Sequence, residues 1–244
     1  MSIVQHCIAP NWPAPANVKA LQTTRKGGGS AAPYASLNLG SHVGDNPLVV
    51  ARNRMLLEPL LPSEPVWLNQ VHGVTVADAG HAGCLPQADA SVSTHRGAVC
   101  VVMTADCLPL LLCDDQGSVV AAAHAGWRGL CDGVIEQTVR AMKVPANSLM
   151  AWLGPAIGAA VFEVGDEVRA AFVAHQPHAA AAFVAAAGGK WMADIYQLAR
   201  LRLQALGIQR IYGGDLCTYS DPERFYSYRR DGATGRMGTF IWLS

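Results

Sequence analysis

The chain has 244 residues, of which 51% are hydrophobic and 15% charged, and its 18 basic side chains balance its 18 acidic ones. This length allows one large domain or two small ones, and the composition is typical of a well-buried globular protein rather than a disordered one. A net charge of zero argues against nucleic acid or an anionic lipid surface as a partner and favours a small molecule.

The N-terminal segment has no basic stretch leading into an apolar run, so it does not resemble a secretory signal. No apolar run approaches the ~20 residues that span a bilayer. The seven cysteines include no CxxC pair, and their odd number without an export signal predicts free thiols in a reducing compartment. We therefore expect a cytoplasmic protein with no membrane segment and no evident protein partner.

The first half of the chain begins with a loop-rich region that is spaced by prolines and contains a glycine turn at 27–29. Residues 48–61 have the apolar spacing of a helix. Short apolar runs then predict strands at 98–103, 108–113 and 118–123. The sequence Asp-Asp-Gln-Gly at 114–117 is a turn signal, so we expect the last two strands to form a hairpin.

The second half mixes helical and strand-like patterns without strict alternation. Helices are expected at 130–142, 162–175 and 192–206, and strands at 149–153, 208–212 and 239–243. Asp194 is a plausible cap of the last helix and Gly207 its stop. Hairpin signals outweigh strand–helix–strand signals, and no composition shift or repeat divides the chain. The sequence therefore predicts an α+β fold in a single domain over 1–244, with mixed sheets flanked by helices.

One cysteine and two histidines stand in unusual local sequence: Cys107 in Ala-Asp-Cys-Leu-Pro, His72 in Gln-Val-His-Gly, and His124 in His-Ala-Gly-Trp-Arg-Gly. Each follows an apolar run and precedes a turn residue. A strand that stops there delivers its last side chain to a sheet edge, where the three could converge. One thiolate and two imidazoles suffice to hold zinc with a fourth position left open for chemistry.

A second interpretation makes Cys107 a nucleophile and His124 or His72 its base. Asp106 is not the expected orienting carboxylate, because neighbours in a strand point to opposite faces; we expect it to fix the turn instead. The alternative without chemistry is a buried thiol beside two hydrogen-bonded core histidines. Three such residues, each before a turn, make this alternative weaker than either kind of site.

Three arginines are candidates for binding an anion. Arg128 lies between two glycines just before a predicted helix, where the backbone can approach a ligand closely. Arg229 belongs to a basic cluster next to the aromatic residues of 225–228, which can stack on a ring. Arg25 precedes the glycine turn. Pairing with a carboxylate or exposure on a solvated loop is the plain alternative for each.

Several segments together resemble the YfiH-like family, whose members are also called DUF152, laccase-domain or multicopper polyphenol oxidase proteins, and peptidoglycan editing factors. The segments that carry the resemblance are Thr-Thr-Arg at 23–25, Ser-Leu-Asn-Leu-Gly at 36–40, His-Val-Gly-Asp at 42–45, Leu-Asn-Gln-Val-His-Gly at 68–73, Thr-Ala-Asp-Cys-Leu-Pro at 104–109, His-Ala-Gly-Trp-Arg-Gly at 124–129, Gly-Pro-Ala-Ile-Gly at 154–158, and 225–238. They cover nearly the whole chain in order.

The resemblance implies a single α+β domain with zinc bound by His72, Cys107 and His124, which would also be the catalytic residues. It implies a purine nucleoside enzyme that phosphorolyses adenosine, inosine and S-methyl-5'-thioadenosine, with phosphate as second substrate, and that deaminates adenosine. The candidate substrate-binding residues in or near the matching segments are Arg25, Asn38, Gln70, Arg128 and Arg229.

Three other functions stay open. Copper could replace zinc in a Cys-His-His site and support polyphenol oxidation, although the eight histidines include none of the His-x-His pairs that a multicopper centre commonly uses. The same site could serve a hydrolase that edits peptidoglycan precursors at a muramyl–amino acid bond. The non-enzymatic alternative is a binding protein stabilised by zinc.

Overall fold

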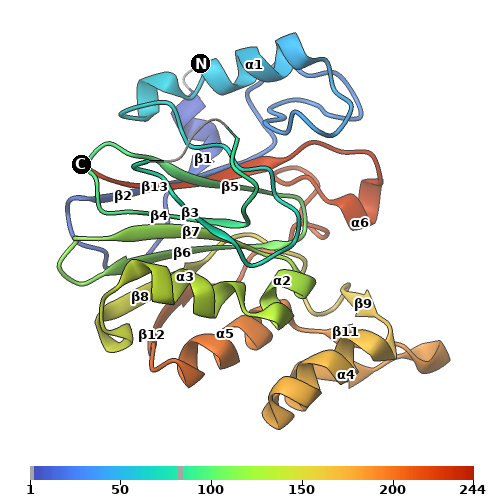
Figure 1. Ribbon diagram of the computed structural model, residues 1–244. Coiled ribbons are helices and arrows are strands. Elements are labelled where there is room, and N and C mark those ends of the chain that lie inside the picture. Colours follow the sequence, from blue (N-terminus) through green and yellow to red (C-terminus); the bar gives the residue numbers. More distant parts are fainter. Residues whose placement is uncertain (1–2, 82–84) are drawn as a thin grey trace.

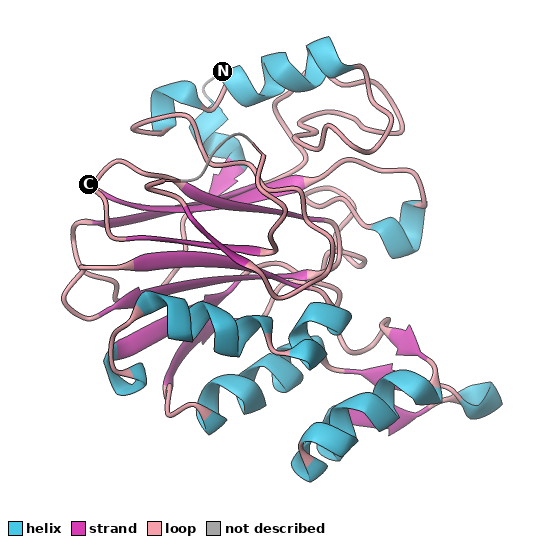
Figure 2. Cartoon of the chain, in the orientation of Figure 1, coloured by secondary structure: helices cyan, strands magenta, loops and turns pink. Residues whose placement is uncertain are grey.

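Two β-sheets stacked face to face form the centre of the molecule (Figures 1 and 2). The computed structural model describes residues 3–81 and 85–244. The smaller sheet has the order β1 (Cys7–Ile8), β2 (Val18–Thr23), β13 (Met237–Leu243), β5 (Cys100–Thr104). The larger has the order β12 (Arg210–Gly213), β8 (Leu149–Leu153), β6 (Leu108–Asp114), β7 (Val120–Ala125), β4 (Ala90–Ser93), β3 (Val76–Asp78).

Helices cover the outer faces of the two sheets, with α1 above the smaller sheet and α2, α3 and α5 below the larger one in Figure 1. A third, small sheet of β10 (Phe183–Ala185), β11 (Trp191–Ala193) and β9 (Glu163–Val164) lies beside α4. The α-helices are α1 (Pro47–Met55), α2 (Trp127–Asp132), α3 (Val134–Met142), α4 (Asp166–His175), α5 (Ile195–Ala205) and α6 (Tyr228–Asp231). The short 3₁₀ segments are η1 (Ile3–His6), η2 (Glu58–Leu60), η3 (Ala146–Ser148), η4 (Pro177–Ala182) and η5 (Ala187–Gly189).

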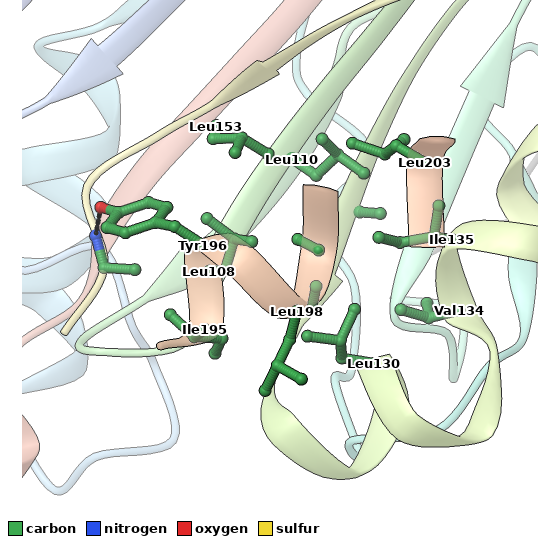
Figure 3. Packing of buried hydrophobic residues seen from close by; sticks show 14 of the residues in the cluster. Leu108, Leu110, Leu130, Val134, Ile135, Leu153, Ile195, Tyr196, Leu198 and Leu203 are labelled. Atoms are coloured by element: carbon green, nitrogen blue, oxygen red, sulfur yellow. Dashed lines mark hydrogen bonds between the residues drawn. The ribbon is translucent and has the colours of Figure 1, made fainter. Parts of the chain in front are cut away.

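Strand β6 is buried on both faces, which explains its unbroken run of apolar residues. Side chains alternate between faces along a strand. Leu108 and Leu110 therefore pack against the helices, among Leu130, Ile135 and Leu198 (Figure 3), while Leu111 and Cys113 pack toward the smaller sheet. Each fully buried leucine contributes about 1.5–3 kcal/mol to folding.

The predicted α+β class is confirmed, and most predicted elements occur near their expected positions. The predicted strand at 149–153 coincides with β8. Asp194 caps α5 by accepting a hydrogen bond from the Gln197 amide at 2.9 Å, and Gly207 follows the helix with φ +91°. The expected hairpin joins β6 to β7, and Asp114 fixes its turn by accepting from the amides of Ser118 and Val119.

Several predictions need correction. The helix expected at 130–142 is split into α2 and α3, because Gly133 adopts φ +99° and breaks the helical path. The segment 162–175 begins with β9, and its helix starts only at Asp166. The N-terminal region expected to be loop contains β2, which forms because β13, from the far end of the chain, pairs with it. Strands β1, β3, β4, β10 and β11 were likewise not predicted. Strand β11 occupies the start of the helix expected at 192–206, and the helix expected at 48–61 ends at Met55.

The six described cysteines are free, while Cys84 lies outside the described residues. In the described ranges no helix is both long and apolar enough to cross a bilayer.

Candidate metal centre

The antiparallel pairing of β6 and β7 brings Cys107 and His124 together. In this hairpin Leu108 lies opposite Ala125, and Pro109 lies opposite His124. Cys107 immediately precedes β6, and His124 is the penultimate residue of β7, so both reach the same edge of the larger sheet. The expectation that three strand ends converge is therefore wrong in detail, since only His124 lies within a strand.

His72 reaches the site from a loop. Its backbone has φ +61°, a region that residues other than glycine rarely adopt and that persists only where surrounding contacts impose it. Asp89 supplies those contacts: its carboxylate accepts hydrogen bonds from the backbone amides of Val71, His72 and Gly73 at 3.1, 2.9 and 2.7 Å. Asp89 thus fixes the position from which the His72 ring is presented.

The same Asp89 carboxylate orients His124. Oδ1 lies 2.8 Å from His124 Nδ1, and the His124 amide donates to the Asp89 carbonyl at 2.7 Å. Both side chains are almost fully buried. With Nδ1 bound to a carboxylate, Nε2 is the ring nitrogen left for the site. Such carboxylate–histidine pairs commonly orient metal-binding histidines and raise their basicity.

The three side chains fit a single metal ion. Cys107 Sγ lies 3.8 Å from His72 Nε2, and the ligand atoms of His72, Cys107 and His124 all lie within 4.8 Å of one another. Bond lengths of about 2.3 Å to sulfur and about 2.1 Å to nitrogen put tetrahedral ligands about 3.6 Å apart. Together the thiol and the two imidazoles offer three ligand atoms. The His124 side chain is buried, Cys107 is partly exposed and His72 is exposed. A fourth position can therefore face solvent.

The ionisation states of Cys107 and His124 depend on each other, and a metal ion bound there would displace the proton that His124 holds. Burial by itself would raise the pKa of the Cys107 thiol, but the adjacent imidazoles of His124 and His72 lower it to about 6. Burial would lower the pKa of His124, but the Cys107 thiolate and the Asp89 carboxylate raise it to about 9. Cys107 is therefore held as the thiolate, which is the form that binds metals and acts as a nucleophile.

Asp106 holds the C-terminal segment against the site. Its carboxylate accepts hydrogen bonds from Thr218 Oγ1 at 2.6 Å, Ser227 Oγ at 3.0 Å and the Arg229 amide at 2.7 Å. These contacts place α6 beside Cys107. Asp106 was expected to fix its own turn; its carboxylate instead binds three residues of the distant segment 218–229, and none of these bonds runs to a histidine.

Two hollows meet at Cys107. The metal-side hollow, about 370 Å³, is lined by His72, Cys107 and His124 and also by His42, Gln70, Met103 and Arg236. The aromatic hollow, about 250 Å³, is lined by Trp127, Arg128, Ile157, Phe162, Ile195 and Arg229. Ala105, Cys107 and Tyr228 line both. The elements that enclose them, α2, α6 and the loop before β9, lie at one end of the molecule (Figure 1).

Three of the sequence-predicted substrate residues line these hollows. Arg128 and Arg229 belong to the aromatic hollow, and Gln70 belongs to the metal-side hollow. The Gln70 amide, however, donates to the Met103 carbonyl and accepts from the Met103 amide, both at 2.8 Å. These two hydrogen bonds to the Met103 backbone hold the Gln70 side chain in place, so Gln70 shapes the hollow and is not free to turn toward a ligand.

The other two predicted substrate residues, Arg25 and Asn38, bind neighbouring loops. Asn38 is fully buried; its side chain accepts from the Gly40 and Arg236 amides and donates to Asp45. Arg25 stacks on Tyr226 and donates to the carbonyls of Ala35 and Pro222. Neither residue lines the metal-side or the aromatic hollow.

Sequence reasoning missed Asp89 and left Arg236 and His42 without a role. The signal for Asp89 was a lone acidic residue within the small and apolar stretch at 88–92. Arg236 is half-buried, and burial lowers its pKa; its Nη1 donates to the carbonyls of Thr234 and Gly235. Within residues 3–81 and 85–244 no carboxylate forms an ion pair with Arg128, Arg229 or Arg236. All three cations can thus bind an external anion.

Gly126 has no side chain, and the space that this leaves is needed by the side chains of His72 and Cys107. A Cβ there would lie 2.8 Å from His72 Cδ2 and 3.1 Å from Cys107 Sγ. Gly126→Ala is therefore expected to displace both side chains and weaken metal binding about 10-fold or more, while the fold persists because φ is −63°. Metal titration against a chelator measures this. The matched control is Gly29→Ala, whose Cβ meets nothing closer than 3.9 Å; equal affinity in both variants would contradict the prediction.

The fold and the site define a class: an α+β protein with a Cys-His-His centre at a sheet edge, between two arginine-lined hollows. The sequence profile of the family described as multi-copper polyphenol oxidoreductase laccase matches residues 19–244. The chain belongs to this family, to which the YfiH-like proteins also belong.

Relatives and solved structures match along nearly the whole chain. A purine nucleoside phosphorylase of Pseudomonas aeruginosa is 56% identical over 237 residues, covering 97% of this chain and 98% of its own. The purine nucleoside phosphorylase YfiH of Escherichia coli is 56% identical over 239 residues, with the same coverage. A crystal structure of a DUF152 protein from Neisseria meningitidis superposes with TM-score 0.95 at 53% identity, covering 98% of this chain and 99% of the other.

Proposed function

We propose that this protein is a zinc-dependent purine nucleoside phosphorylase. Its substrates would be adenosine, inosine or S-methyl-5'-thioadenosine together with phosphate, and its products the free base and ribose 1-phosphate or its methylthio derivative. Deamination of adenosine to inosine is proposed as a second activity of the same centre. The names of the relatives support the reaction class. The observation that carries the proposal is the Cys-His-His centre between two hollows lined by cations.

Phosphorolysis makes defined demands on such a site. A phosphate oxygen forms a bond to the sugar C1', the bond from C1' to the purine nitrogen breaks, and the departing base takes up a proton. The sugar is oxocarbenium-like as the bond breaks, so the enzyme must hold an anion against it and ease departure of the base. A zinc ion held by His72, Cys107 and His124 would supply a Lewis acid that polarises bound groups.

We assign different parts of the substrate pair to the two hollows. The metal-side hollow contains Arg236 and His42, which suit phosphate. The aromatic hollow presents Trp127 and Phe162, with Arg128 lying 4.4 Å from the Trp127 ring centroid, and suits a flat purine. Tyr228 and Cys107 line both hollows. The glycosidic bond from C1' to the purine would therefore lie where the two hollows meet.

Purified protein of measured metal content tests the proposal. Adenosine, inosine and S-methyl-5'-thioadenosine would each be incubated with and without phosphate, and the products separated by chromatography. The expected result is phosphate-dependent release of free base that is lost on metal removal and restored by zinc. Inosine formed from adenosine without phosphate would support deamination. The proposal fails if protein carrying about one zinc per chain converts none of these nucleosides.

Arg236→Ala is expected to raise the KM for phosphate by about 10- to 100-fold, because a charge-assisted hydrogen bond contributes about 1.5–3 kcal/mol. The KM for nucleoside should change far less. Steady-state kinetics with either substrate varied measures both values.

Arg128→Ala and Arg229→Ala test the competing assignments of phosphate to the aromatic hollow. Arg140→Ala, on an exposed face of α3, controls for loss of a surface charge. A phosphate KM that is unchanged in Arg236→Ala but raised in either of the other two would move phosphate to the aromatic hollow.

A further inference from the structure

A second group of metal-ligand side chains lies on the surface, away from the Cys-His-His centre. Asp78, His81 and His95 are all exposed, and their ligand atoms lie within 4.8 Å of one another. Asp78 ends β3, the edge strand of the larger sheet, while His95 follows the neighbouring strand β4. The two strands are parallel, with Asp78 opposite Val92, so the segments that follow β3 and β4 leave the sheet at the same end.

Hydrogen bonds of the backbone hold the turns that carry these three residues. The His81 amide donates to the Asp78 carbonyl at 3.1 Å, which closes a turn and places the two side chains side by side. The His95 amide donates to Ser93 Oγ at 3.0 Å. Gly80 provides room for the His95 ring, since a Cβ at position 80 would collide with His95 Nδ1. The three side chains are thus brought together by their own strands and turns.

The contacts among the three side chains match those of ligands that share an ion. Asp78 Oδ1 accepts from the Gly80 amide at 2.8 Å, and Oδ2 lies 3.2 Å from His81 Nδ1. Tetrahedral ligands with bonds of about 2.1 Å lie about 3.4 Å apart, so this pair already has the required separation. The His81 and His95 rings meet edge to face, with centroids 4.9 Å apart. The His95 side chain is exposed, so rotation about its side-chain bonds suffices to bring a ring nitrogen within bonding distance of an ion held by Asp78 and His81.

We propose that Asp78, His81 and His95 form a second, separate binding site for a divalent transition-metal ion. Two imidazoles and one carboxylate suit Zn²⁺, Ni²⁺ or Cu²⁺, and they leave coordination positions open to solvent or to a further ligand. The carboxylate adds negative charge, and no sulfur ligand takes part. The bound ion would tie the turn after β3 to the end of β4 and so stabilise the edge of the sheet.

The second site is distant from the first. Asp89, which orients His124, immediately precedes β4, and His95 follows it, so the four extended residues of β4 lie between them, a length of about 13 Å. The proposal therefore does not depend on the proposed function: removal of the second site should leave nucleoside turnover unchanged.

Metal titration of the full-length, metal-stripped protein tests the proposal. Zn²⁺ binding would be followed by competition with a chromophoric chelator, and Co²⁺ spectra would separate the sites, because only the centre with Cys107 gives thiolate-to-cobalt absorption. The wild type is expected to bind two ions, the second without a thiolate band. The double variant His81→Ala/His95→Ala should bind the second ion about 10-fold more weakly or worse, and the ion should no longer raise its Tm. Gly80→Ala should also weaken this binding, by displacing the His95 ring.

The matched control is His175→Ala/His178→Ala, which removes two other exposed histidines, from the end of α4 and from η4. This variant should retain both ions. One bound ion in the wild type would overturn the proposal. A second ion that persists in His81→Ala/His95→Ala, or that disappears in His175→Ala/His178→Ala, would overturn it as well.

Discussion

An Asp89→Asn variant is expected to bind metal at the Cys107 centre about 10- to 100-fold more weakly than the wild type. The carboxylate accepts from the amides of Val71, His72 and Gly73 and from the His124 ring. An asparagine of the same shape has one accepting oxygen, and its NH₂ group must face one of these N–H donors. Chelator competition measures the affinity, and thermal denaturation measures the accompanying loss of stability.

Asp114→Asn is the matched control for this experiment. Asp114 is also a buried aspartate, and it accepts from the Ser118 hydroxyl and from the amides of Ser118 and Val119 in the β6–β7 turn. This turn lies at the opposite end of the hairpin from Cys107. The control should lose comparable stability, about 1–3 kcal/mol for each buried group left without a partner, and keep its metal affinity. Equal affinity in both variants would show that Asp89 supports only the fold.

Cys107→Ser is expected to lower phosphorolysis about 10³-fold or more and to release the metal. The imidazoles hold the pKa of the thiol near 6, whereas a serine hydroxyl stays protonated at neutral pH and is a poor metal ligand. Turnover and bound metal would be measured on the same preparation. The control is Cys217→Ser, which changes another partly exposed thiol, one that accepts from the Gly158 and Ser220 amides.

Loss of activity in Cys107→Ser fits both a zinc ligand and a nucleophile. Metal removal separates them. If zinc is required, metal-free wild-type protein is inactive and recovers when zinc is added. A metal-free preparation with full activity would instead assign the chemistry to the thiolate and its histidine base. Copper added in place of zinc, with a polyphenol as substrate, tests the oxidase suggested by the family description.

The second metal site has a practical consequence for these experiments. Metal content alone would not report on the Cys107 centre if Asp78, His81 and His95 bind an ion of their own. Each variant of the first centre is therefore best compared in the His81→Ala/His95→Ala background, where one ion per chain is expected.

Local sequence determined the elements whose signals lie within a few residues. The unbroken apolar run of β6 predicted a strand buried on both faces, and Asp194 and Gly207 predicted the limits of α5. The Asp-Asp-Gln-Gly turn predicted the hairpin that brings Cys107 to His124. The family was recognisable from motifs spread along the whole chain. That His72, Cys107 and His124 bind a metal remains a prediction.

Only the tertiary structure decided which distant residues share a site. Asp89 orients both histidines, and Arg236 reaches the metal-side hollow from the C-terminal segment; neither stands near Cys107 in the sequence. Asn38 and Arg25 stand in matching motifs, yet their polar atoms bind loop backbone. Strand β2 exists because β13 pairs with it across the length of the chain. Hydrogen bonds between segments far apart in sequence depend on how the chain packs, so the secondary-structure propensities of neighbouring residues do not predict them.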